Sequence, residues 1–339
     1  MWTTLGATDH ILIADARKQA SNVIARVRRG LTGIEPAPPK PESFQAVAEN
    51  WLKRRVQAKG LRSGTKIQQT LQRHVFPVWG EREFTSIRRG DVARLLDHIE
   101  DNHGGRIADL VLSYVRSICN CFAARTEDYS SPLVPGMRRH GLQKRERVLT
   151  DDELRRVWRA SEAHPGAFGG LVRVLLLTAQ RAAKVASMRW DDVGPDGVWN
   201  IRTQAREKGN AGALPLPSIA LEIIRSQRRI ARNPYVFVGI GNGHCSPRSQ
   251  AKLAIDKTSG VTGWVLHDLR RTARSLMSRA GVSSEHAERV LGHAIKGVEG
   301  VYDRHRYEAE KGRALEALAG LITRIIDGNA DVVPFRREA

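Results

Sequence analysis

One stretch near the C-terminus, residues 265–302, constrains the fold of this chain more than any other. It begins VLHDLRRTARSLMSRAG, in which apolar residues are spaced three or four apart: Leu269, Ala273, Leu276 and Ala280. This spacing predicts an amphipathic helix that ends at the next glycine. The following SSEHAERVLGH predicts a second short helix that begins with a serine N-cap. Each helix has one apolar face, so the chain must supply a core that covers both.

Four polar side chains of this stretch can act together on a phosphodiester. His267 and Arg270 lie one turn apart at the start of the first predicted helix, His293 follows the second, and Tyr302 comes nine residues later. Guanidinium and imidazole groups stabilise negative charge and transfer protons, and a phenol can form a covalent intermediate. The residue types therefore favour a site for nucleophilic attack on phosphorus.

Length and charge indicate a two-domain protein that binds a polyanion. The chain has 339 residues, and 55 Lys and Arg against 36 Asp and Glu give a net charge of +19. The length suits two domains of ordinary size. An excess of cations is typical of proteins whose DNA affinity comes from neutralising phosphates. Composition alone leaves a ribosome-associated or merely basic cytoplasmic protein equally open.

Other composition signals exclude several classes of protein. The three cysteines, Cys119, Cys121 and Cys245, form neither a disulfide framework nor a metal-binding pattern. No apolar run approaches the roughly 18 residues that a membrane-spanning helix requires, and the N-terminus lacks the regions of a signal peptide. We therefore expect a cytoplasmic protein with no metal, no cofactor and no membrane partner.

Helical periodicity and proline or glycine punctuation divide the chain into six segments. The segment over 36–42 is rich in proline and cannot continue a helix. The segment over 43–135 carries four amphipathic patterns, and Ser43 is the N-cap of the first. The segments are a helix within 1–35, a linker over 36–42, an all-α domain over 43–135, a basic linker over 136–149, a second domain over 150–327 and a polar tail over 328–339.

The second domain begins with Thr150-Asp-Asp-Glu153, a capping box that predicts a helix start. The apolar run that follows is interrupted near Ala179, which places Arg181 at the start of another helix. Helices over 218–230 and 308–326 are predicted further along.

A β-hairpin is predicted between these helices. GVWNI (197–201) and ALPLP (213–217) have the composition of strands and flank a polar, glycine-bearing segment with Lys208 near its tip. The predicted fold class is therefore mainly α with a small β-hairpin: an all-α domain followed by a mixed α+β domain.

The motifs H-x-x-R (267–270) and L-G-H (291–293), followed by a tyrosine, resemble the C-terminal half of the tyrosine recombinases, the phage integrase family. The resemblance spans about residues 43–325 and includes an arginine at a helix start and a hairpin lysine. It implies a core-binding domain over 43–135 and a catalytic domain over 150–327 that cuts and rejoins DNA through a 3′-phosphotyrosine. It also implies that residues 1–35 are the remnant of an arm-binding domain.

The resemblance implies a role for each of six catalytic residues. Arg181 and Arg270 would bind the non-bridging oxygens of the attacked phosphate, where negative charge grows in the transition state. His293 would hydrogen-bond a non-bridging oxygen as well.

Three residues would transfer protons or form the covalent bond. Tyr302 would be the nucleophile, and His267 could accept its phenolic proton. Lys208 would protonate the leaving 5′-oxygen. Arg206 competes for the place of Lys208, and Tyr307 competes for that of Tyr302.

The resemblance further implies a homotetramer on paired attachment sites in double-stranded DNA, assisted by accessory DNA-bending or directionality proteins. Such an enzyme integrates or excises a mobile element and would be associated with the nucleoid. Two alternatives remain open: a type IB topoisomerase, which applies the same chemistry to one duplex, and a DNA-binding protein that has lost catalysis. The cations of the basic linker are candidates for phosphate contacts: Arg138, Arg139, Lys144, Arg145 and Arg147.

The chain departs from the family pattern after its first arginine. Where the family has R-x-x-E, this sequence has Arg181-Ala-Ala-Lys184. A cation one turn from Arg181 is expected to repel its guanidinium. The strands that precede the first helix in the family are also missing. The lysine predicts a weakened but not inactive enzyme, in which Lys184→Glu raises both the cleavage rate and the thermal stability.

Overall fold

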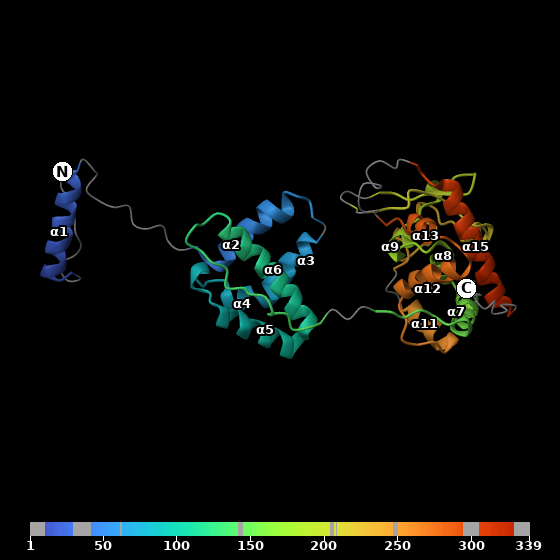
Figure 1. Ribbon diagram of the computed structural model, residues 1–339, viewed down its shortest axis with the longest axis horizontal. Helices are drawn as coiled ribbons and strands as arrows, with labels where there is room; N and C mark the ends of the chain where they lie inside the picture. The colour runs from blue at the N-terminus through green and yellow to red at the C-terminus, as the bar shows by residue number, and fades with distance from the viewer. Residues whose placement is uncertain are drawn as a thin grey trace, which may run out of the picture. The chain divides into compact units, whose positions relative to one another are not determined.

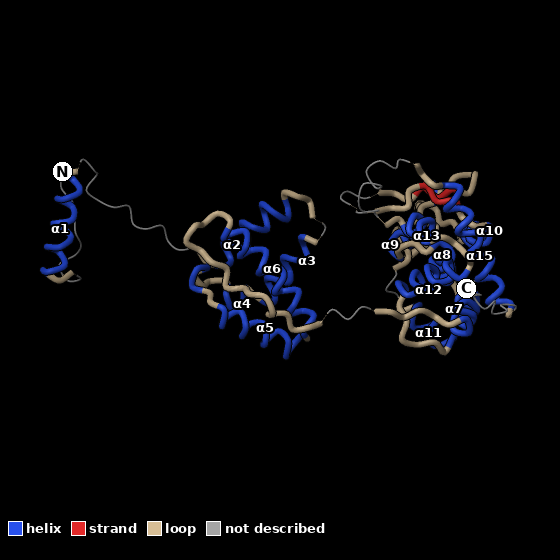
Figure 2. The backbone as a smooth tube through the Cα atoms, in the orientation of Figure 1, coloured by secondary structure: helices blue, strands red, loops and turns tan. Residues whose placement is uncertain are grey.

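The chain folds as two compact units that divide after Gln143 (Figure 1). The computed structural model describes residues 11–29, 42–61, 63–141, 145–203, 207, 209–246, 250–293 and 305–328. In this part of the chain, helices dominate and the only sheet is one short antiparallel pair of strands (Figure 2). The predicted fold class, mainly α with a small β-hairpin, is therefore confirmed.

The first unit is helical, as predicted. Ser43 caps its second helix, since the Ser43 hydroxyl accepts a hydrogen bond from the Ala46 amide at 3.3 Å. Its core gathers around Phe44, whose ring lies 5.4 Å from that of Trp79 and 5.6 Å from that of Phe84. The helices are α1 (Ile13–Arg28), α2 (Phe44–Trp51), α3 (Gly64–His74), α4 (Phe76–Trp79), α5 (Arg89–His103) and α6 (Gly105–Ala123).

The second unit is built around α8, whose residues are mostly apolar and, apart from Ala167 and Arg173, buried. A helix of this composition belongs at the centre of a core, and α8 packs against α7, α10, α12 and α15. The helices are α7 (Asp151–Ala163), α8 (Ala167–Thr178), α9 (Ala182–Ala186), α10 (Ser218–Arg225), α11 (Ala251–Ser259), α12 (Leu266–Arg279), α13 (Ser284–Leu291) and α15 (Glu308–Asp327).

The capping box at the start of α7 forms as predicted. The Thr150 hydroxyl accepts from the Glu153 amide, and the Glu153 carboxylate accepts from the Thr150 amide at 2.9 Å. The predicted hairpin also forms, from β1 (Val198–Asn200) and β2 (Ala213–Pro215), with Trp199 opposite Leu214. Both of these side chains are buried, which fixes the register of the pair.

Two helices of the second unit differ from the sequence predictions. The helix predicted over 218–230 ends at Arg225, and α11 was not predicted at all. Only Ile255 and Ser259 of α11 are buried and Leu253 is exposed, so this segment lacks a regular apolar stripe. Among the described helices, none is long and apolar enough to cross a membrane.

Candidate active site

Arg270 lies at the centre of the candidate site, on the first turns of α12. Its side chain is 6% exposed, and its guanidinium binds three groups from other elements. Nη1 donates to the Ala179 carbonyl (2.7 Å), and Nη2 donates to the Leu291 carbonyl (2.8 Å) and lies 3.0 Å from His293 Nε2. Burial and then repulsion by Arg181 lower the pKa of Arg270 to about 10, so it stays charged at neutral pH.

The Ala179 carbonyl reaches Arg270 because of an uncommon backbone conformation. Ala179 ends α8 in the left-handed region, with a φ of 53°. This conformation costs an L-residue about 1–2 kcal/mol. A charge-assisted hydrogen bond to a buried guanidinium offsets that cost. The predicted helix break at Ala179 is thus confirmed, and the break itself helps to bind Arg270.

His293 follows α13 and is held on both ring nitrogens. Its Nδ1 lies 2.5 Å from the Glu288 carboxylate, so Nδ1 carries a proton and Nε2 accepts from Arg270 in the neutral ring. Burial raises the pKa of Glu288, but hydrogen bonds from His293 and Arg274 outweigh it and lower the pKa overall. Glu288 was not among the predicted site residues, although its position five residues before His293 on a helix could have indicated it.

His267 lies in the first turn of α12, three residues before Arg270, as predicted from H-x-x-R. Loss of solvation lowers its pKa, and the positive charges of Arg271, Arg270 and Arg181 lower it further. The ring is therefore neutral at pH 7 and can accept a proton. The influence of Arg181 and Arg270 on this pKa shows that both guanidiniums lie near His267.

Arg181 precedes α9 and is the more accessible of the two arginines. Its side chain is 39% exposed, against 6% for Arg270. Nη1 donates to the Gly209 carbonyl at 3.0 Å and lies 3.7 Å from the Glu207 carboxylate. Within the described ranges, its Nε and Nη2 groups have no hydrogen-bond partner. They are the donors that an incoming phosphate can use.

The loop between β1 and β2 packs directly against the L-G-H motif. Gly292 has a φ of 64°, and a Cβ there would collide with the Ala211 amide nitrogen and lie 2.5 Å from the Asn210 carbonyl carbon. No larger residue fits this contact without moving the backbone. The structure therefore explains why glycine stands before His293.

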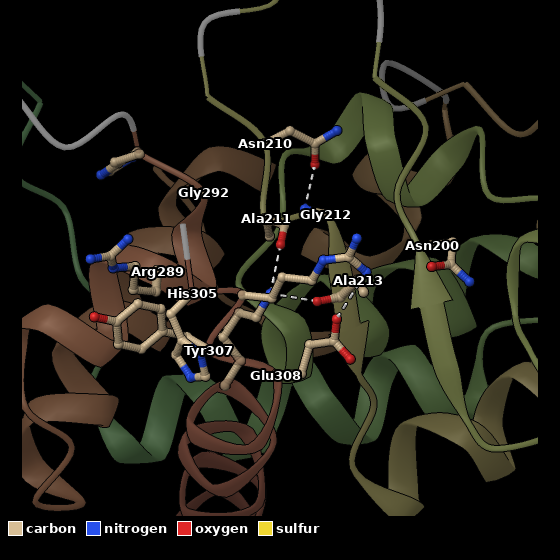
Figure 3. Close-up of a pocket in the computed structure, with 13 residues that line it drawn as sticks. Asn200, Asn210, Ala211, Gly212, Ala213, Arg289, Gly292, His305, Tyr307 and Glu308 are labelled. Carbon is tan, nitrogen blue, oxygen red and sulfur yellow. Dashed lines mark hydrogen bonds and ion pairs between the residues drawn. The ribbon is translucent and has the colours of Figure 1, made fainter. Parts of the chain in front are cut away.

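A buried lysine ties the same hairpin to the C-terminal helix. Lys311 of α15 is 4% exposed, and its Nζ donates to the carbonyl oxygens of Ala211 (2.8 Å) and Ala213 (2.5 Å). Figure 3 labels these two acceptors. Burial lowers its pKa. These residues border a cavity of about 410 Å³ that His293 and Tyr307 also line. Sequence reasoning missed Lys311, which stands in the first turns of an ordinary amphipathic helix.

Several predicted site residues lie outside the described residues: Lys144, Arg206, Lys208 and Tyr302. Tyr307, the alternative nucleophile, is described. It begins α15, and the Arg289 guanidinium lies 4.1 Å from the centre of its ring (Figure 3). This cation–π contact gives Tyr307 a packing role.

Arg145, one of the predicted phosphate ligands, binds the start of α12. Its Nε lies 2.8 Å from Asp268 Oδ2, and it also contacts the Gly263 carbonyl. Asp268 is completely buried and also accepts from Arg271 (2.7 Å) and from the Val265 amide (2.9 Å). Asp268 thereby holds the first turn of α12, which carries His267 and Arg270.

Two other predicted phosphate ligands also form ion pairs. Arg139 lies 2.5 Å from Asp97, and Arg147 lies 2.5 Å from Glu153. A DNA phosphate would have to compete with these carboxylates. Arg138 is exposed. Phosphate contact by the basic linker stays a prediction.

The described residues contain no group of three or more His, Cys, Asp or Glu side chains that could hold a metal ion. The positive charge of the site comes from guanidinium groups. Two guanidiniums and two imidazoles converge from α9, α12 and the end of α13, an arrangement that can bind a phosphate and exchange protons with it.

Comparison with known proteins agrees with this arrangement. The model of the "Phage integrase family" matches residues 147–309, and the model of the "Phage integrase central domain" matches residues 44–132. Prophage integrase IntZ of Escherichia coli (strain K12) is 23% identical, over 96% of this chain and 85% of that protein.

Solved structures of similar fold are integrases bound to DNA. The lambda integrase dimer bound to a COC′ core site has a TM-score of 0.60 at 18% identity, over 91% of this chain and 89% of that chain. The lambda integrase tetramer bound to a Holliday junction has a TM-score of 0.59 at 19% identity, over 90% and 89%. From these matches and the motifs, the chain belongs to the phage integrase family and is a tyrosine-type site-specific DNA recombinase.

Proposed function

We propose that this recombinase cleaves DNA with Tyr302 and the site formed by Arg181, His267, Arg270 and His293, with Lys208 as general acid. The phenolic oxygen of Tyr302 attacks phosphorus, and the bond from phosphorus to the 5′-oxygen breaks. The 3′-phosphate stays on the tyrosine, and the free end is a 5′-hydroxyl. Attack by a 5′-hydroxyl of another strand reverses these steps and rejoins the DNA.

Two protons move in this step. His267 accepts the phenolic proton, for which its lowered pKa suits it, because the ring is neutral before attack. Lys208 donates a proton to the leaving 5′-oxygen, because an alkoxide is a poor leaving group. Resealing uses the same two groups in the opposite direction.

The observation that carries this proposal is that the guanidiniums of Arg181 and Arg270 lie near each other and near His267. Among the described residues the Nε and Nη2 groups of Arg181 have no hydrogen-bond partner, and Arg270 is fixed by the carbonyl groups of Ala179 and Leu291. A phosphate between them would replace the hydrogen bond from Arg270 to His293 and receive donors from both arginines. His293 Nε2, no longer bound to Arg270, would then face a non-bridging oxygen of the phosphate.

We propose that the substrate is a pair of attachment sites in double-stranded DNA and that four copies of the chain assemble on them. The fold supports this, since structures of lambda integrase contain a dimer on a core site and a tetramer on a Holliday junction. The net charge of +19 supports DNA binding as well. We further propose that accessory DNA-bending or directionality proteins take part, and that the protein works in the cytoplasm at the nucleoid.

A nicked suicide substrate that carries the attachment core tests the chemistry. Cleavage beside the nick releases a short fragment, resealing becomes impossible, and the protein stays bound to DNA as an SDS-resistant adduct. We expect the wild type to form this adduct, Tyr302→Phe to form none, and Tyr307→Phe to retain it. Tyr302→Phe should bind DNA with nearly unchanged affinity, because it lacks only one oxygen atom.

The same substrates separate the alternatives. An adduct in Tyr302→Phe would disprove the assignment of the nucleophile. Strand exchange between two duplexes distinguishes a recombinase from a topoisomerase, which relaxes a single supercoiled duplex. DNA binding without any adduct in the wild type would indicate a protein that has lost catalysis.

A further inference from the structure

The loop between β1 and β2 is held against α9 by two cations, Lys184 and Arg181. Lys184 Nζ donates to the Arg202 carbonyl (2.5 Å) and to Glu207 Oε2 (2.6 Å). Arg181 Nη1 donates to the Gly209 carbonyl (3.0 Å) and lies 3.7 Å from Glu207 Oε1. One carboxylate therefore lies between the two cations, and the contacts span both limbs of the loop.

From the sequence, Lys184 was expected only to repel Arg181, and the structure corrects this because Lys184 has a carboxylate partner. Lys184 lies one turn after Arg181, as expected, but Glu207 neutralises it from a segment 23 residues further along the chain. The Lys184 and Glu207 side chains are only 11% and 15% exposed. Two opposite charges this well shielded attract each other more strongly than a surface pair.

We propose that Lys184 and Glu207 are a charge-exchanged pair in which Glu207 positions the guanidinium of Arg181. The carboxylate that the family places on the helix, one turn after its first arginine, is supplied here by the loop. The helix supplies the cation that holds this carboxylate in place. The inference rests on the proposed role of Arg181 at the attacked phosphate.

The geometry favours positioning over a purely structural bond. Arg181 is partly exposed, and an unrestrained arginine samples many rotamers. Glu207 and the Gly209 carbonyl both engage Nη1, and this fixes one arm of the guanidinium. The other arm keeps the planar pair of donors that can bind two oxygens of one phosphate. Without the Glu207 carboxylate, Arg181 would stay in the site, but its guanidinium would no longer be held in one orientation.

The test is a charge-exchange cycle of Lys184→Glu, Glu207→Lys and the double variant. Single-turnover cleavage of the suicide substrate is measured at saturating DNA, so that binding does not limit the rate. Each single variant places two like charges together. We expect each to cleave roughly tenfold more slowly, equivalent to about 1.4 kcal/mol in the barrier. The double variant restores a carboxylate one turn after Arg181 and should recover most of the wild-type rate.

Two further measurements separate positioning from stability and from DNA binding. The melting temperatures of the wild type, the two single variants and the double variant show whether the two residues are also coupled in stability. DNA affinity is measured with the four proteins in a Tyr302→Phe background and should not change. Arg279→Glu is the control, because it breaks another ion pair of the same unit, 2.7 Å from Asp151 at the far end of α12. It should lower the melting temperature and leave the cleavage rate unchanged.

Several outcomes would overturn the inference. Faster cleavage by Lys184→Glu would support a decaying site in place of an exchanged pair. If the double variant loses as much cleavage rate as the two single variants' losses combined, the two residues do not act together. If the two residues are coupled in the melting temperature but not in the cleavage rate, the ion pair only stabilises the fold and does not position Arg181. A wild type without any adduct refutes the proposed function itself, and the positioning role with it, whereas the melting cycle still reports whether the ion pair forms.

Discussion

Gly292→Ala tests how closely the β1–β2 loop must approach the L-G-H motif. The substitution adds one methyl group at the residue before His293. That methyl group would meet backbone atoms of Asn210 and Ala211, which cannot rotate away as a side chain could. We therefore expect the hairpin and the end of α13 to move apart, which lowers stability and displaces His293 from Arg270.

The magnitude follows from two separate costs. An alanine in the left-handed region costs about 1–2 kcal/mol, and forced overpacking of a tight contact typically adds about 1–3 kcal/mol. Gly260→Ala isolates the first cost. Gly260 also ends a helix, with a φ of 65° against 64° for Gly292, but the nearest atom to its Cβ would be a flexible Arg156 nitrogen at 3.6 Å.

The assay compares the two alanine variants with the wild type by urea denaturation and by single-turnover cleavage. Gly260→Ala should lose about 1–2 kcal/mol and cleave at nearly the wild-type rate. Gly292→Ala should lose about 2–5 kcal/mol and cleave more slowly under conditions where it is still folded. Equal losses of stability in the two variants would refute the argument, because the close approach of the loop would then carry no cost.

Three other predictions concern charge and proton transfer. Burial raises the pKa of Asp268, but hydrogen bonds from Arg145, the Val265 amide and Arg271 lower it overall, below the ordinary 3.8. The stability that this carboxylate contributes is therefore complete above about pH 3.8 and is lost as the pH falls through the lowered value. Urea midpoints should show a stability deficit for Asp268→Asn near neutral pH that shrinks in acid, and a deficit independent of pH would contradict this. Lys208→Ala should slow cleavage of an ordinary substrate far more than of one with a 5′-bridging sulfur, whose thiolate leaves without a proton; equal slowing would transfer the role to Arg206. Cleavage should persist in excess EDTA, because guanidinium groups supply the positive charge, and a rate restored only by magnesium would contradict that.

The sequence predicted the parts of the fold that depend on neighbouring residues. The capping box at Thr150, the break at Ala179 and the start of α12 before Arg270 are all determined within a few residues of the chain. The hairpin could be predicted because two apolar segments flank a polar one. The family motifs added the order of the candidate site residues, which local patterns cannot provide.

The partners of these residues could not be predicted in the same way. Asp268 binds Arg145 across 123 positions in the sequence, and Lys184 binds Glu207 across 23. Which carboxylate neutralises which cation depends on how the helices and loops pack. For this reason the sequence indicated an unfavourable cation at Lys184, whereas in the structure Lys184 forms an ion pair with Glu207.

The three acceptors of Arg270 have a consequence for how the enzyme is made. Two are carbonyl groups at the ends of α8 and α13, and the third is His293, so the guanidinium is satisfied only after segments 91 and 21 residues away have docked. Burying this charge earlier would be unfavourable. Assembly of the candidate site is thus coupled to the docking of the ends of α8 and α13 against α12. A chain in which either end has not docked has no assembled candidate site.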